Sequence, residues 1–203
     1  LRDLQSGTYT SFGNVADFAW QDDGPRLAMT IDGAEQAGNG IRLYNAASGR
    51  LRTLASEPGD YTGLSWQPSG PGLAAMRARS SDDWEHKTHV VLAWQDLTSG
   101  SAETHRFDPA EVDAFPDSLR IVEYRTPEWA TDGDRLFFGV QEREATEENG
   151  PSPDSAAADS SLEDYDPADV QVWHTSDVEI IPWQEVRAKQ DRQDNYLSAW
   201  HLG

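Results

Sequence analysis

The chain contains no cysteine and almost no lysine, and both absences restrict what it can be. Without cysteine there is no disulfide framework, thiolate metal site or cysteine nucleophile. Only Lys87 and Lys189 are lysines among the 16 basic residues, against 36 acidic ones, so the net charge is −20. A surface this acidic repels phosphate backbones and anionic lipids. We therefore expect neither nucleic acid nor membrane as a partner.

The sequence also lacks a long apolar run and the motifs of common active sites. No stretch approaches the roughly 18 apolar residues that a membrane-spanning helix needs. Gly-x-Ser-x-Gly, Ser-x-x-Lys, Gly-x-Gly-x-x-Gly and phosphate-binding loops are absent. The 203 residues still include eight Trp, six Tyr and six Phe, which is ample material for a core. We expect a folded chain with no cofactor, no metal and no catalytic residue.

What the sequence does contain is a repeat, in which Gly lies four residues after Trp and Leu lies three after Gly. Its members are Trp20, Gly24 and Leu27; Trp66, Gly70 and Leu73; and Trp129, Gly133 and Leu136. Asp or Ser precedes each Gly, and Gly tolerates the positive φ of tight hairpin turns. The flanks alternate apolar and polar residues, as half-buried strands do. Each copy predicts a strand, a tight turn and a second strand, with the Trp packed between neighbouring units.

Further strand-like segments follow the first two hairpins, at 40–45, 51–54, 89–94 and 103–107. Four short strands within about 40–50 residues are typical of a β-propeller blade. We predict an all-β chain, a partial β-propeller of about three four-stranded antiparallel blades plus flanking strands. Its parts are the end of a preceding blade (1–14), three blade-like repeats (15–56, 57–108 and 109–185), and a short helix with the start of a further strand (186–203). Whether that last strand completes the third blade or opens a fourth stays open.

An acidic segment interrupts the third repeat. Residues 142–169 hold ten acidic side chains and one Arg, with few apolar ones, so they cannot bury enough surface to offset the entropy of ordering. This composition predicts a mobile insertion at 143–168. Its aspartates at 164–169 do not follow the EF-hand spacing, so we expect no calcium there. The strand-like text resumes at Asp169–His174.

Three histidines, His86, His89 and His105, fall within 20 residues and raise the question of zinc. No third ligand follows His86 and His89 at a recognised spacing. If His89 begins a strand, His86 lies in the preceding loop and need not face the same way. We expect exposed or turn-bonded histidines and no metal.

The Trp–Gly–Leu unit with its second hairpin resembles the propeller repeats of TolB-like proteins and of the prolyl oligopeptidase family of serine peptidases. Asp169–His174 and Asn195–Leu197 resemble part of the propeller of bacterial dipeptidyl-peptidase and acylaminoacyl-peptidase-like members. In that family a non-catalytic propeller caps an α/β-hydrolase domain and restricts which peptides reach a Ser–Asp–His triad. The resemblance therefore implies an excised propeller fragment that gates substrate access or mediates interactions. This chain alone would not be an enzyme, and its partner would be a peptide substrate of the parent peptidase.

Two other functional readings are open. A stand-alone TolB-like propeller would be a protein-interaction scaffold, and a hydrolase domain encoded after the last blade would distinguish the peptidase from it. A glycan-binding propeller has less support, because no paired carboxylates stand at equivalent strand ends. In each case an open arc of blades exposes unpaired edges, so we also expect that the chain either associates with copies of itself or persists as an open arc.

The acidity is spread over the whole chain, since nine of the twenty net negative charges lie in residues 142–169 and eleven in the rest. Together with the scarcity of lysine, this suggests adaptation to high salt, where screening removes self-repulsion. The melting temperature should then rise steeply between low and molar KCl, and a flat response would contradict the idea. The compartment stays open, and a bacterial, secreted or periplasmic setting is the one we expect.

Overall fold

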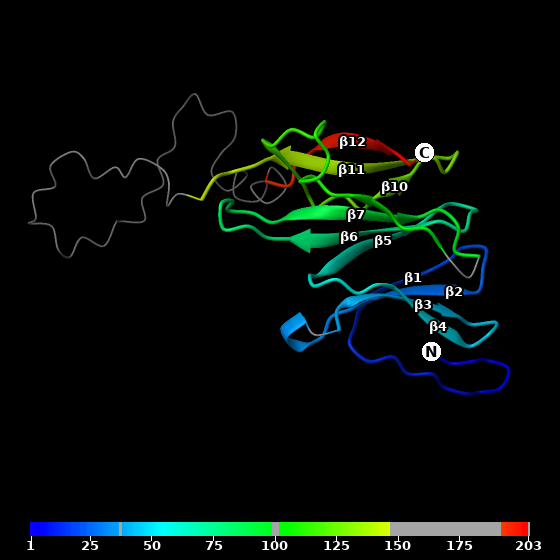
Figure 1. The fold of residues 1–203 in the computed structure, drawn as a ribbon. Coiled ribbons are helices and arrows are strands. Elements are labelled where there is room, and N and C mark those ends of the chain that lie inside the picture. Colours follow the sequence, from blue (N-terminus) through cyan, green and yellow to red (C-terminus); the bar gives the residue numbers. More distant parts are fainter. Residues whose placement is uncertain (37, 99–101, 147–191, 203) are drawn as a thin grey trace, which may run out of the picture. The chain divides into compact units, whose positions relative to one another are not determined.

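The computed structural model of the chain describes residues 1–36, 38–98, 102–146 and 192–202 (Figure 1). Nearly all of these belong to one compact unit, Leu1–Glu144 with Asn195–Gly203. It contains three four-stranded antiparallel sheets, and the one helical element among the described residues is a 3-10 turn, Ala34–Gln36. The predicted all-β architecture of four-stranded, blade-like sheets is confirmed. No described helix is long and apolar enough to cross a bilayer.

The first two sheets are simple meanders, in which each strand pairs with the next in the chain. The first sheet consists of β1 (Val15–Trp20), β2 (Arg26–Ile31), β3 (Gly40–Asn45) and β4 (Arg50–Ala55). The second consists of β5 (Tyr61–Trp66), β6 (Leu73–Arg79), β7 (Thr88–Trp94) and β8 (His105–Phe107). In both, the hairpin that the repeat predicts is the first pair of strands, followed by the two strand-like segments that we expected.

The third sheet departs from the meander. It consists of β9 (Leu119–Ile121), β10 (Glu128–Trp129), β11 (Arg135–Glu142) and β12 (Tyr196–His201). The two shortest strands, β9 and β10, both pair with β11, at opposite ends of its eight residues. The final strand β12 also pairs with β11, so it completes the third sheet. Residues 147–168 of the insertion predicted at 143–168, the predicted strand at 169–174 and most of the predicted helix lie outside the described residues.

The second sheet is packed on both faces. Along β6, Leu73 and Ala75 join the cluster shared with the first sheet, while Ala74 and Met76 join the cluster shared with the third. The expected alternation of apolar and polar residues is therefore wrong for β6, the second strand of the repeat hairpin. The central residues of β6 and β7 are apolar in unbroken runs because each strand has a sheet on either side.

Candidate functional site

The repeat tryptophans join one sheet to the next. The Trp66 indole Nε1–H donates to the carbonyl of Ala19 at 2.9 Å, and that of Trp129 donates to Ser65 at 3.1 Å. Ala19 and Ser65 each precede a repeat Trp, so the two bonds are equivalent. Trp129 is 8% exposed, whereas Trp20 is 41% exposed. These rings hold the sheets that position the loops described below.

The repeat leucines and glycines have different structural roles. Leu27, Leu73 and Leu136 are all buried. Gly133 has the expected positive φ of 76°, but the φ values of Gly24 and Gly70 are not positive. In the turn of Gly70 the preceding residue, Ser69, has the positive φ instead. The predicted turn chemistry is therefore wrong at Gly24 and Gly70.

Close packing of glutamine side chains explains those glycines. A Cβ at Gly24 would lie 2.1 Å from Oε1 of Gln21, and one at Gly70 would lie 2.4 Å from Cδ of Gln67. The Gln21 side chain also donates across the sheet boundary to the Gly70 carbonyl, at 3.0 Å. The repeat pattern did not predict this contact, although Gln follows the repeat Trp at both 20–21 and 66–67.

A buried carboxylate, Asp108, organises one end of the second sheet. It follows β8, and its side chain is fully buried. Arg79 at the end of β6 donates to both carboxylate oxygens, at 2.9 and 2.8 Å, and Arg106 donates at 2.6 Å. The Ala110 N–H adds a fourth bond at 3.1 Å. Burial alone would raise the pKa of Asp108, but the hydrogen bonds and the arginine charges outweigh it and hold the pKa below its usual range.

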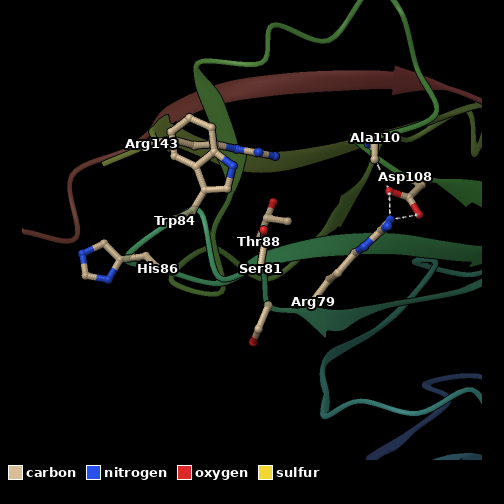
Figure 2. Close-up of a pocket in the computed structure, with 9 residues that line it drawn as sticks. Arg79, Ser81, Trp84, His86, Thr88, Asp108, Ala110 and Arg143 are labelled. Carbon is tan, nitrogen blue, oxygen red and sulfur yellow. Dashed lines mark hydrogen bonds and ion pairs between the residues drawn. The ribbon is translucent and has the colours of Figure 1, made fainter. Parts of the chain in front are cut away.

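A hollow of about 170 Å³ lies beside this cluster. In Figure 2, Trp84 and Arg143 lie over one another on one side of it, and the Arg79–Asp108 pair lies on the other. The Arg143 guanidinium carbon is 5.1 Å from the centre of the Trp84 ring, a cation–π contact. The Nε–H of Arg143 donates to the Leu119 carbonyl at 2.7 Å, which fixes the side chain.

An adjoining hollow shares Arg79 and Ser80 with the first, and its lining adds more basic residues. We call the side chains around both hollows the arginine end. Its basic members are Arg77, Arg79, Lys87, Arg106 and Arg143, and its acidic members are Asp60, Asp108 and Glu111. Guanidinium groups in this number suit a carboxylate or another oxyanion as ligand. Two further carboxylates pair with these groups, since Glu57 contacts Arg77 and Arg106 and Glu123 contacts Lys87. The five basic residues are therefore matched by five acidic ones, whereas the chain as a whole is strongly acidic.

The three clustered histidines do not come together. His89 is fully buried in β7, so the expectation of an exposed or turn-bonded residue is wrong for it. Its Nδ1 faces the Ile121 carbonyl at 2.9 Å and its Nε2 lies 3.3 Å from a Glu123 carboxylate oxygen, so it ties β7 to β9. Burial lowers the pKa of the His89 imidazole below its usual value.

The described residue His86 does have possible metal-ligand neighbours. The ligand atoms of Glu85, His86 and Glu144 lie within 4.8 Å of one another, but all three side chains are exposed. His86 faces Glu144 at 3.6 Å, the geometry of a surface ion pair. We assign no metal to this group, because exposed acidic clusters commonly bind none.

Comparison with known proteins adds little to this picture. No family model and no curated protein matches the chain. Among solved structures, it is similar to hydrazine synthase of Kuenenia stuttgartiensis, with 14% identity and a TM-score of 0.42. The match covers 66% of this chain and 41% of that one. At this TM-score the likeness carries no argument about function.

Proposed function

We propose that the chain is a non-catalytic propeller segment of a prolyl-oligopeptidase-like serine peptidase, and that its arginine end binds an anionic group of the peptide. The observation that carries this proposal is the gathering of four arginines around two hollows, of which Arg79 and Arg143 keep N–H groups for a ligand, in a chain of net charge −20. Acidity elsewhere on the surface would steer an anionic ligand away from other sites and toward this end.

The guanidinium groups of this end keep donors for a ligand. Arg79 uses only its Nη1 for Asp108, and Arg143 uses only its Nε for the Leu119 carbonyl. Their other N–H groups have no acceptor among the described residues, so they can donate to a carboxylate. The Trp84 ring beside Arg143 supplies an apolar surface for the neighbouring part of a peptide. Binding without chemistry is the role expected of a domain that limits which peptides reach a separate catalytic centre.

The described histidines that have side-chain contacts are held by groups other than a nucleophile. His86 faces Glu144, and His89 faces the Ile121 carbonyl and Glu123. We therefore expect this chain alone to leave chromogenic peptide and ester substrates intact. Measurable turnover that copurifies with the folded chain would contradict the non-catalytic role.

Peptide binding can be tested with a fluorescein-labelled alanine peptide that has a free C-terminal carboxylate, and with its C-terminal amide. Fluorescence anisotropy should show tighter binding of the carboxylate. Arg143→Gln should weaken that binding about tenfold, as expected for loss of a charge-assisted contact. Arg50→Gln makes the same charge change on exposed β4 of the first sheet and should leave binding unchanged.

Thermal unfolding of each variant checks that the fold is retained. Equal affinity for the carboxylate and the amide would overturn the proposal, as would equal effects of the two substitutions.

A further inference from the structure

The outer face of the first sheet is covered less completely than the equivalent faces of the other two sheets, because Leu27 and Met29 are buried but Phe18 and Trp20 are exposed. Phe18, two residues before Trp20, is 62% exposed. The residues at the same repeat position are Leu64, which packs against the core, and Pro127, which is buried. Trp20 is likewise more exposed than Trp129, at 41% against 8%. Its indole N–H has no acceptor among the described residues, whereas those of Trp66 and Trp129 each donate to a carbonyl. Phe18 and Trp20 thus leave part of this apolar face open.

The outer face of the third sheet is also exposed where the equivalent faces of the first two sheets are buried. Thr30, Met76 and Gly139 each lie three residues after a repeat Leu, and their cross-strand partners are Ile41, Val91 and Leu197. Ile41 and Val91 are fully buried against the next sheet, whereas Leu197 is 58% exposed. Leu136, Phe138 and Val140 face the second sheet. Because side chains alternate along a strand, Gly139 and its partner Leu197 lie on the opposite face of the third sheet.

These two faces are the ends of one series of sheets, since the second sheet packs against both others (Figure 1). We propose that copies of this chain associate head to tail, with the first sheet of one copy packed on the third sheet of another. The repeat indicates what covers these faces. Between the sheets of one chain, the face that carries Trp66 packs on the face that carries Ile41, and the face that carries Trp129 packs on the face that carries Val91. This is a heterologous contact between two different surfaces.

The repeat also specifies the polar contact at that junction. Glu128 occupies the position of Ala19 and Ser65, so its carbonyl is the acceptor for Trp20 of the second copy. On the first sheet, the surface that would contact the other copy is an apolar groove of about 270 Å³, lined by Leu1, Phe12, Val15, Phe18, Trp20, Leu27 and Met29.

The junction between copies should be weaker than the internal ones. Ala130 stands where the other repeats have Gln21 and Gln67, so the bond that Gln21 makes to Gly70 has no counterpart there. The charge of −20 on each copy also opposes association. Screening should therefore strengthen association, and molar KCl is the condition in which to measure it.

Sedimentation equilibrium over a wide concentration range tests the proposal. Wild-type chain should associate reversibly, and more tightly in molar than in low KCl. Trp20→Ala, at the first sheet, and Leu197→Asp, at the third, should each weaken self-association at least about tenfold. A mixture of the two variants should recover a one-to-one complex, because each retains the face that the other has lost. Leu4→Asp, at a 90% exposed residue that does not line the groove, is the control.

Several outcomes would overturn the head-to-tail contact. A wild-type chain that stays monomeric at every concentration and in molar KCl would do so. If Leu197→Asp still associates with itself and only Trp20→Ala loses association, the contact would be a symmetric one between two first sheets. Association that survives both substitutions would indicate a different surface. Thermal unfolding of both variants separates loss of contact from loss of fold.

Discussion

Replacement of Trp129 by Ala should lower the free energy of unfolding by about 3–5 kcal/mol, the usual cost of removing a buried large aromatic ring. The same substitution at Trp20 should cost about 1 kcal/mol or less, in the range of surface changes. Both residues occupy the same position of the repeat. The difference follows from their surroundings, because Trp129 is buried against the second sheet and bonds to Ser65, whereas Trp20 is 41% exposed.

Urea unfolding of dilute protein in low salt measures both effects on the monomer. A third variant, Trp129→Phe, separates the ring from its N–H. It retains most of the apolar contact and should lose about 0.5–1.5 kcal/mol with the bond to Ser65, plus a packing cost. Similar losses for Trp129→Ala and Trp20→Ala would contradict the role of the repeat Trp as the joint between sheets. An effect of Trp129→Phe as large as that of Trp129→Ala would place the stabilisation in the hydrogen bond alone.

The repeat predicted the hairpins because its signal is local. Trp20 and Leu27 pair across the first hairpin, and Trp129 and Leu136 pair across the last one, as the spacing required. The third sheet was less predictable. Its strands β9 and β10 are too short to show periodicity, and β12 reaches β11 only after a long stretch of chain. Pairing over that distance depends on tertiary packing, which the sequence pattern does not encode.

The roles of individual side chains were predicted less well than the strands. His89 was expected to be exposed or bonded within a turn, but a buried imidazole bonded to a carbonyl of a distant strand has no signature in a single sequence. Likewise Arg79 and Asp108 are 29 residues apart, and neither lies in a recognised motif. They meet because antiparallel strands bring the end of β6 and the segment after β8 to the same edge of the sheet. The sequence showed an acidic chain, and only the fold shows where its basic residues gather.

Asp108 should be the most sensitive residue of that end. Replacement by Ala removes the acceptor of Arg79, Arg106 and the Ala110 N–H together, and leaves two guanidinium groups facing each other. Breaking a buried ion pair costs about 3–5 kcal/mol when the remaining charge stays buried. Here Arg79 and Arg106 are 48% and 34% exposed and can regain water, so a loss of about 2–3 kcal/mol is expected.

The pH dependence of stability gives an independent test of the same carboxylate. The pKa of Asp108 is lower in the folded chain than in the unfolded chain, so the unfolded state binds more protons on acidification. The contribution of Asp108 is therefore complete above the unfolded pKa, about 3.9, and is lost as the pH falls through the folded value. The gap in unfolding free energy between wild type and Asp108→Asn should be constant near neutral pH and narrow below about pH 4. The exposed residue Asp113 provides the control, since Asp113→Asn should leave stability unchanged near neutral pH. A gap between wild type and Asp108→Asn that stays constant on acidification would show that the Asp108 charge does not stabilise the fold, and the arginine end would then be held by packing alone.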